Sequence, residues 1–404
     1  MAMTDTAEQR VLPRTLAGAT VLQVVPALRD SPQARTTVST AHALVQVGAR
    51  IIVAGEHGEL VDQLKAFGGE WLPFESATMN PGKRRANADT LTKLVDAERV
   101  AIVHAKSAAA AWSAAVAAER NGVQLITELP DLPRRRMWLA TFYLSALSRG
   151  DRIISHSLFN ARPMMARYRI PPERISVIPR SIDLRYFNPV NVPSERITKL
   201  RQVWGIPHGV RIALVPGRIA SANGHLVLAR AVRKLADSGM RNVTFVLVGD
   251  DRRSPRFARR FWKVAQGEGV DALFRMAGFH EDMPATYAAA DFVVVPYTSA
   301  PIYGRVVAEA QAMALPVIAS AIGPLPENMI TPPRMPDELR TGWEVKPGDA
   351  AELAKAIETA LALDADDYRA HCARARQFAE YTFSPSRAAA ATLEIYASLL
   401  ESQD

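Results

Sequence analysis

Cysteine is nearly absent from this 404-residue sequence, which contains Cys372 alone. A single thiol can form neither an intramolecular disulfide nor a cysteine-based metal site, a pattern typical of proteins in a reducing compartment. The eight histidines show no metal-ligand spacing such as HExxH. We therefore expect a packed, unreactive thiol at position 372 and no metal site.

Long hydrophobic runs are also missing. No apolar stretch reaches the roughly 18 charge-free residues of a membrane-spanning helix, and residues 1–17 form a tail without the apolar core of a signal peptide. The sequence predicts a cytoplasmic protein. Any membrane contact is expected to be peripheral, at the inner face of the cytoplasmic membrane.

Acidic residues are outnumbered by basic ones, 41 to 49, which gives a formal net charge of +8. The excess favours an anionic partner such as nucleic acid, a phospholipid surface or the phosphates of a nucleotide. Nucleic acid is not expected, because no recognition-helix, zinc or RNA-platform signature accompanies the charge. The basic stretches 80–93 and 132–138 are expected to meet an anionic bilayer or to form a solvated face, whereas a solvated face is favoured for 250–263.

Short apolar runs alternate with longer amphipathic stretches, which predicts an α/β protein with doubly wound parallel sheets. The first set of strands is predicted at 20–28, 49–56, 100–107, 124–130, 151–157 and 174–183. The second set is predicted at 211–219, 243–251, 272–279, 291–297, 315–320 and 342–349. Ser107 and Ser157 follow strands without the context of a nucleophile and are interpreted as loop caps.

A polar, proline-containing segment at 187–209 separates the two sets and is the predicted junction. The resulting domains are a tail at 1–17, a first domain at 18–190, a second domain at 191–384, and a C-terminal helix at 385–404 that packs back on the first domain. Two tandem domains of this kind bind ligands in the cleft between the carboxyl ends of their strands.

The stretch "VPGRIASANGHLVLARA" (215–231) places Gly217 at the end of a strand, Arg218 on the following loop and Gly224 at the start of a helix. A guanidinium beside a helix N-terminus suits a diphosphate. The alternative is a surface arginine on an ordinary turn.

The stretch "APIYGRVVAEAQAMALPVIAS" (300–320) begins a helix after Gly304, where the backbone N–H groups of Arg305 and Val306 would form a second anion cradle. Glu309 lies about one and a half turns along that helix. Its carboxylate could accept hydrogen bonds from two ribose hydroxyls, and the alternative is a solvated helical glutamate.

Together with "LVGDD", "AGFHEDMPATYAAADFVVVPY" and "TGWEVKPGD", these stretches resemble the retaining glycosyltransferases of family 4. In the first half, "IVHAKSAAAAWSAAVAAERNGVQLITE" and "PPERISVIPRSIDLRYFNP" are similar to the acceptor domain of bacterial members, so the resemblance covers nearly the whole chain. It implies the GT-B architecture, two Rossmann-like domains with an interdomain cleft. It further implies metal-independent, retaining transfer from a UDP- or GDP-sugar to a cell-envelope glycan or lipid-linked acceptor of lipopolysaccharide or exopolysaccharide type.

The resemblance assigns roles to individual residues. Arg218 matches the arginine that stabilises the leaving diphosphate, and Glu309 matches the glutamate that holds the donor ribose; these two are the expected catalytic residues. The remaining expected donor-binding residues are Gly217, Asn223, Gly304, Arg305 and Val306. On the acceptor side, the basic groups expected to reach the cleft are His104, Lys106, Arg134, Arg135 and Arg136.

The sequence also departs from the family pattern around this cleft. Asn223 replaces a phosphate-binding lysine, and Pro301 replaces the first glutamate of a Glu-x7-Glu motif. The other departures are Ser31-Pro32 and Pro324 at glycine pairs, and Pro130 and Asp131 where relatives have histidine and glycine. Each lost charged hydrogen bond to a charged ligand weakens donor use by about 1.5–3 kcal/mol.

Three hypotheses remain open from the sequence. The first is a working glycosyltransferase. The second is a catalytically impaired GT-B paralogue that serves as a partner or regulatory subunit of an active transferase, and the third is a nucleotide-sugar-binding or epimerase-like protein on the same fold.

Overall fold

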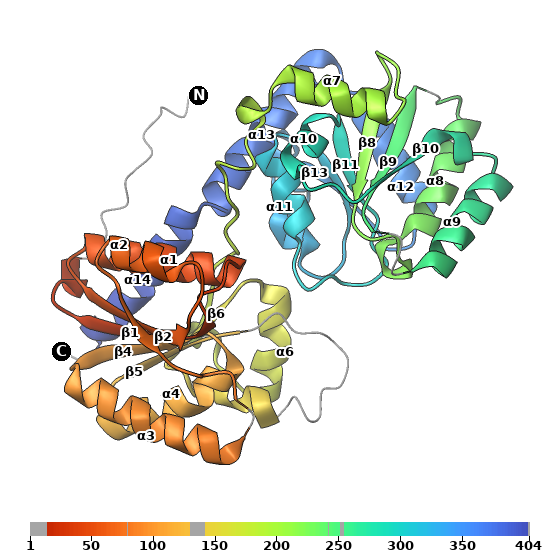
Figure 1. Cartoon of the computed structure of the whole chain (residues 1–404). Helices are drawn as coiled ribbons and strands as arrows, with labels where there is room; N and C mark the ends of the chain where they lie inside the picture. Colours follow the sequence, from red (N-terminus) through yellow and green to blue (C-terminus); the bar gives the residue numbers. More distant parts are fainter. Residues whose placement is uncertain (1–13, 79, 130–141, 241, 251–253, 403–404) are drawn as a thin grey trace. The chain divides into compact units, whose positions relative to one another are not determined.

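The computed structural model describes residues 14–78, 80–129, 142–240, 242–250 and 254–402. The chain divides into two compact units (Figure 1). Unit 1 comprises Met1–Ser181 together with Pro385–Asp404, and unit 2 comprises Ile182–Ser384. Each unit has its own parallel sheet and its own hydrophobic core.

Unit 1 is built on a seven-stranded sheet in the order β3-β2-β1-β4-β5-β6-β7, in which every neighbouring pair is parallel. The strands are β1 (Thr20–Ala27), β2 (Arg50–Glu56), β3 (Glu70–Pro73), β4 (Val100–Ala105), β5 (Gln124–Glu128), β6 (Arg152–Ser155) and β7 (Ile175–Val177). The strand order reverses between β1 and β4, which is where open parallel sheets have a ligand-binding crevice at the carboxyl ends of their strands.

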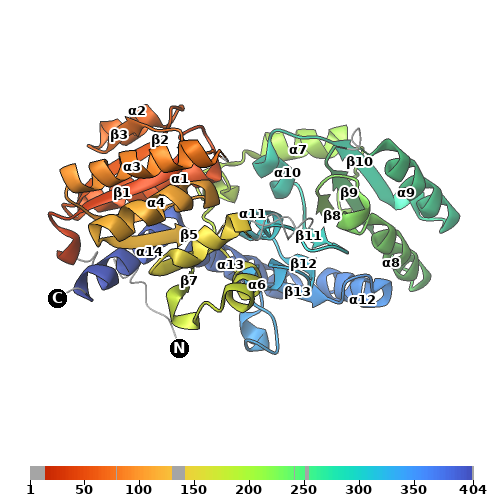
Figure 2. The same cartoon turned by 90° about the horizontal axis from the view of Figure 1, so that it is seen from below.

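Helices cover both faces of the unit 1 sheet (Figures 1 and 2). One face packs against α1 (Pro32–Gln46), α2 (Val61–Ala66) and α14 (Pro385–Glu401), and the other against α3 (Pro81–Ala97), α4 (Ala108–Asn121) and α6 (Leu158–Tyr168). The side chains of Ser107 and Ser157 accept backbone N–H bonds at the starts of α4 and α6. The interpretation of both serines as caps is therefore confirmed.

Unit 2 is built on a six-stranded parallel sheet in the order β10-β9-β8-β11-β12-β13. The strands are β8 (Arg211–Pro216), β9 (Val243–Val248), β10 (Phe274–Gly278), β11 (Phe292–Val295), β12 (Val317–Ser320) and β13 (Gly342–Val345). Here the strand order reverses between β8 and β11, so the loops that follow these two strands meet at the switch point.

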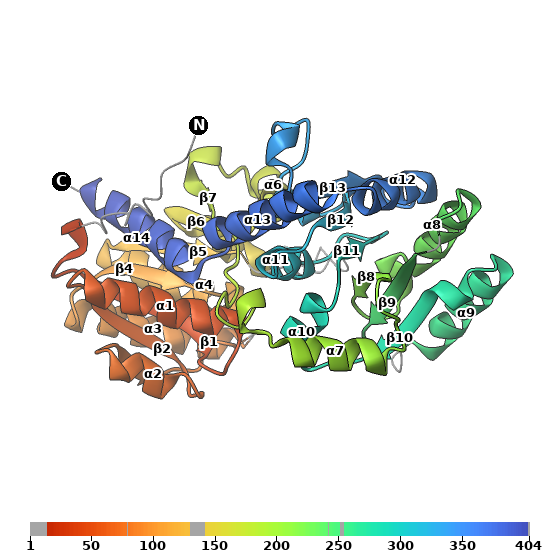
Figure 3. The ribbon, with the colours of Figure 1, turned by 90° about the horizontal axis from the view of Figure 1, so that it is seen from above.

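The helices of unit 2 also form two layers. One face of the sheet packs against α8 (His225–Asp237), α9 (Pro255–Gly267) and α12 (Ala350–Leu361), and Figure 3 shows α8 beside both of its neighbours. The other face packs against α7 (Ser194–Val203), α10 (Met283–Ala288), α11 (Arg305–Ala312) and α13 (Ala365–Thr382).

The predicted fold class, two doubly wound parallel sheets, is confirmed. Two details differ from the prediction. The edge strand β3 was not expected, because its four residues are only partly buried and lack an apolar run. The chain also enters unit 2 after Ser181 rather than at 190, because Ile182 and Phe187, which precede the predicted boundary, are buried in the unit 2 core. Among the described residues, no helix combines the length and the hydropathy needed to cross a membrane.

Candidate functional site

Gly217 directly follows β8 with a backbone that only glycine adopts without strain, at φ 129°. A Cβ at this position would lie 3.0 Å from the amide nitrogen of Asn223 and 3.1 Å from the hydroxyl of Tyr297. Gly217 therefore lets two polar side chains from different loops approach the end of the strand.

Arg218 follows on the same loop, and its side chain is exposed. Within the described part of the chain, its guanidinium forms no hydrogen bond or ion pair with another residue. An exposed guanidinium at the carboxyl end of a strand is available for an anionic ligand. This is the position that the resemblance assigns to the donor diphosphate.

Asn223 and Gly224 complete the β8–α8 loop. The side-chain amide of Asn223 donates to the carbonyl oxygen of Arg218 at 2.8 Å, so its nitrogen already closes the turn. Gly224 begins α8 as its N-cap at φ 73°, and a Cβ there would lie 1.6 Å from the carbonyl oxygen of Pro296. The expectation that Gly224 opens a helix is confirmed, and the loop is packed tightly against the end of β11.

Gly304 is the N-cap of α11, as expected, and no side chain caps this helix. A Cβ on Gly304 would lie 2.2 Å from the amide nitrogen of Asn328, which is buried and has no hydrogen-bond partner. Arg305 is exposed and Val306 is half-buried in the first turn. The first-turn N–H groups of α11 are therefore not satisfied by a capping side chain.

Glu309 is buried, with 6% of its surface exposed. The alternative interpretation of Glu309 as a solvated helical glutamate is therefore wrong. One carboxylate oxygen accepts from Arg305 Nε at 2.5 Å, and the other accepts from the hydroxyl of Tyr287 at 3.0 Å. Burial raises the pKa of Glu309, and the Arg305 guanidinium opposes that rise. Each oxygen retains a lone pair, so the carboxylate can still accept from a ligand hydroxyl.

Tyr297 follows β11 and was not singled out by any sequence pattern. Its ring packs against the unit 2 core, and its hydroxyl lies against Gly217. Burial raises the pKa of Tyr297 to about 12; the Glu309 carboxylate adds to the rise and the Arg218 guanidinium opposes it. The hydroxyl is thus a neutral donor within electrostatic reach of both predicted catalytic residues.

The prolines that replace family residues have structural roles where they are described. Pro301 is half-buried, and its ring lies close to Gly323. A Cβ added to Gly323 would lie 3.2 Å from Pro301 Cδ. Ser31 caps α1 by accepting from the N–H of Ala34, with Pro32 at the first helical position, where a missing N–H costs nothing. Pro324 precedes a short 3₁₀ turn.

On unit 1, Lys106 and His104 belong to a buried polar cluster at the carboxyl ends of β4 and β5. Lys106 Nζ lies 3.3 Å from Glu128 Oε2, and His156 Nε2 lies 2.9 Å from Glu128 Oε1. His104 Nδ1 pairs with the hydroxyl of Tyr396 of α14 at 2.7 Å. Lys106 and His104 are therefore paired inside unit 1, and no sequence pattern pointed to their partners Glu128 and Tyr396.

Burial and neighbouring charges shift the pKa values of His104 and Glu128 in this cluster. Burial lowers the pKa of His104 to about 3, helped by the neighbouring Lys106 ammonium. Burial alone would raise the pKa of Glu128, but Lys106 and His156 outweigh it and hold that pKa well below the usual value. The predicted acceptor-side residues Arg134, Arg135 and Arg136, and the departures Pro130 and Asp131, lie outside the described residues.

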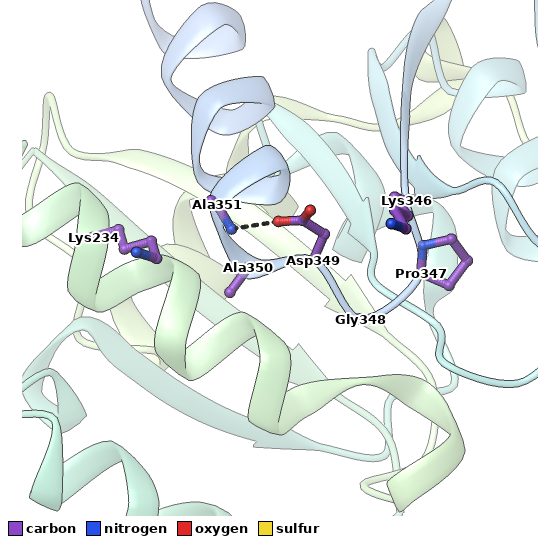
Figure 4. A pocket seen from close by; sticks show the side chains of 7 residues that line it. All are labelled: Lys234, Lys346, Pro347, Gly348, Asp349, Ala350 and Ala351. Atoms are coloured by element: carbon purple, nitrogen blue, oxygen red, sulfur yellow. Dashed lines mark hydrogen bonds between the residues drawn. The ribbon is translucent and has the colours of Figure 1, made fainter.

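A shallow hollow of about 430 Å³ lies at the start of α12 (Figure 4). It is lined by Lys234, Lys346, Pro347, Gly348, Asp349, Ala350 and Ala351. Asp349 caps α12 by accepting from the N–H of Ala351 at 2.9 Å, so the helix N-terminus there is already satisfied. The hollow contains none of the predicted donor-binding residues.

Two protein families match the chain. Residues 33–186 match the family described as Glycosyltransferase Family 4, and residues 210–362 match Glycosyl transferases group 1. The two matches fall on units 1 and 2 in the order that the resemblance requires. The chain belongs to the family 4-like glycosyltransferases.

Named relatives agree with this class. A D-inositol 3-phosphate glycosyltransferase of Xylanimonas cellulosilytica is 30% identical over 252 residues, which are 61% of this chain and 57% of that protein. A D-inositol 3-phosphate glycosyltransferase 1 of Catenulispora acidiphila is 29% identical over 45% of this chain and 43% of its own length. The matched part thus spans about half the length of these relatives.

Solved structures show the same GT-B fold. A glycosyltransferase from Rickettsia africae aligns over 95% of this chain and 99% of its own, with 28% identity and a TM-score of 0.75. The Anabaena protein Alr3699/HepE in complex with UDP aligns over 94% of this chain and 100% of its own, with 19% identity and a TM-score of 0.71.

Proposed function

We propose that this protein transfers a sugar from a nucleotide-sugar donor to a hydroxyl acceptor, with retention of configuration and without a metal. The observation that carries the proposal is the exposed guanidinium of Arg218 after β8, which has no partner among the described residues, in the same unit as the buried carboxylate of Glu309 on α11. Both belong to unit 2, so the proposed donor site depends on one unit alone.

In the proposed mechanism, Arg218 binds the diphosphate and stabilises the negative charge that develops on it as the bond to the sugar breaks. The uncapped first turn of α11 assists with its N–H groups. Glu309 accepts hydrogen bonds from the ribose hydroxyls, and its bonds to Arg305 and Tyr287 hold the carboxylate in place.

The acceptor we propose is a cell-envelope glycan or a lipid-linked acceptor of lipopolysaccharide or exopolysaccharide type, reached by a cytoplasmic protein that lies at the inner face of the membrane. The names of the relatives support including inositol 3-phosphate as a small acceptor in any test. HepE was solved with UDP and with UDP-glucose, which supports starting with uridine donors.

The second candidate is a catalytically impaired paralogue that acts as a partner or regulatory subunit of an active transferase. Two observations favour it: no carboxylate stands at Pro301, and the Asn223 amide nitrogen donates to its own loop rather than to a ligand. Copurification of a second transferase with a wild-type protein that turns over no donor would support this candidate.

The test is donor turnover by the purified full chain with UDP-, GDP- and ADP-sugars, with and without acceptors. The wild type is expected to release nucleoside diphosphate from at least one donor, and Arg218→Ala is expected to lose at least tenfold, since one charged contact contributes about 1.5–3 kcal/mol. Arg230→Ala removes an exposed arginine of α8 and serves as the matched control. Equal silence of the wild type and Arg218→Ala on every donor would refute the proposal.

A further inference from the structure

Tyr297 places a hydroxyl group in the proposed donor site that no family motif supplies. A Cβ on Gly217 would touch this hydroxyl at 3.1 Å and the Asn223 amide at 3.0 Å, so both groups border the same point at the end of β8. Arg218 is the next residue of that loop. The hydroxyl therefore lies where the loops after β8 and β11 converge.

The hydroxyl has no hydrogen-bond partner among the described residues. The contrast with Tyr287 is direct, because the Tyr287 hydroxyl donates to Glu309 at 3.0 Å and is fully buried. Tyr297 is only half-buried, with its ring in the core and its hydroxyl at the strand end. A phenol placed in this way keeps both a donor proton and a lone pair for a ligand.

We propose that the Tyr297 hydroxyl donates a hydrogen bond to a diphosphate oxygen of the nucleotide donor; this role rests on the proposed function. Tyr297 thereby supplies a donor contact in a site where the family lysine and the first family glutamate are replaced by Asn223 and Pro301. It is a donor-binding residue for the diphosphate that Arg218 neutralises.

Three features favour the diphosphate over the base or the sugar. The hydroxyl borders Gly217, the residue directly before Arg218, and a glycine is required there for this approach. The Arg218 guanidinium also opposes the rise that burial causes in the pKa of the Tyr297 hydroxyl, so the hydroxyl lies in the positive field that would attract an anion. The hydroxyl stays protonated at neutral pH, so it donates to a phosphate oxygen without repelling it.

The experiment is calorimetric titration of UDP, GDP, uridine and guanosine into the full chain, in the wild type and in Tyr297→Phe. The variant is expected to bind the preferred nucleoside diphosphate about tenfold more weakly, which corresponds to about 1.4 kcal/mol. Its affinity for the matching nucleoside is expected to stay unchanged. Because the hydroxyl has no partner in the described part of the chain, the melting temperature of Tyr297→Phe is also expected to equal that of the wild type.

Tyr287→Phe is the matched control for folding, because it removes a hydroxyl that already bonds to buried Glu309 and should lower the melting temperature. Equal diphosphate affinity in the wild type and Tyr297→Phe would overturn the role of Tyr297 and leave the proposed function intact. An equal loss for nucleoside and diphosphate would also overturn it, since the contact would then be to the base or ribose. A wild type that binds no nucleoside diphosphate would overturn both proposals.

Discussion

The buried pair of Lys106 and Glu128 gives the sharpest prediction about stability. Glu128→Gln removes the carboxylate charge that lies 3.3 Å from Lys106 Nζ, in a place where the two side chains are 2% and 6% exposed. Unit charges at that distance attract by about 5 kcal/mol at an effective dielectric constant of about 20. Measured losses for breaking a buried pair are about 3–5 kcal/mol, because the remaining charge is left buried and unpaired.

Urea unfolding of the full chain measures the loss, and hydrogen exchange of the β4 and β5 amides assigns it to unit 1. Glu128→Gln is expected to destabilise unit 1 by about 3–5 kcal/mol. The double variant Lys106→Met/Glu128→Gln is expected to recover much of that, because it leaves no unpaired charge. Glu119→Gln is the matched control: it breaks an exposed ion pair with Arg149 and should cost less than about 1 kcal/mol. A loss of stability in Glu128→Gln no larger than that of Glu119→Gln would show that the buried pair does not stabilise unit 1.

Three further predictions concern unit 2. Gly224→Ala is expected to lower stability by at least about 2 kcal/mol and to impair donor binding, because the new Cβ clashes with the Pro296 carbonyl in addition to the cost of a positive φ. In the same melting assay, the control Gly239→Ala should lower stability by about 1 kcal/mol, because Gly239 has φ 87° but open space around it. Glu309→Gln is expected to lower donor turnover without lowering stability. Burial raises the pKa of Glu309, so the wild type loses stability as the pH rises through that pKa. The variant has no carboxyl group at this position and should not show this loss. Burial lowers the pKa of His225 to about 4, so this histidine alone should make stability fall by about 1.4 kcal/mol per pH unit as the pH drops from 6.5 to 4. His225→Gln should lessen the slope of a pH series of urea titrations by that amount, while the slope from other buried groups such as His104 remains.

Much of the fold could be predicted from the sequence, because buried parallel strands are short, continuous apolar runs. Every strand of unit 2 falls within or beside such a run, as with "DFVVVPY" and β11. The edge strand β3 could not be found in this way, since its residues, including Trp71 and Pro73, are not buried on both faces. A strand buried on both faces must consist of apolar residues and can therefore be recognised in the sequence, whereas an edge strand tolerates polar residues.

The candidate site was predictable in part. Glycine at 217, 224 and 304 marks turns that the structure confirms, and Glu309 lies on the expected helix. The burial of Glu309 was not predictable, because its partner Tyr287 comes from α10 and only the fold brings the two together. Tyr297 carried a usable signal: it lies two residues after the buried strand β11, and the carboxyl ends of parallel strands share one edge of the sheet.

The buried cluster of unit 1 illustrates the same limit. From the sequence, Lys106 and His104 are expected to reach the cleft as basic groups. Their partner Glu128 ends the neighbouring strand β5, which is a relation of sheet order rather than of sequence spacing. Strand order is set by packing of the whole sheet, so a pairing of this kind cannot be read from one stretch of sequence.

The proposed donor site depends on binding of a nucleoside diphosphate by the Arg218 guanidinium in unit 2. Titration calorimetry of UDP and GDP into the full chain measures this binding, with Arg218→Ala and the matched Arg230→Ala beside the wild type. The wild type is expected to bind at least one of the two nucleotides, Arg218→Ala to bind it at least tenfold more weakly, and Arg230→Ala to bind it as the wild type does. Equal affinity in the wild type and Arg218→Ala would contradict this role of Arg218.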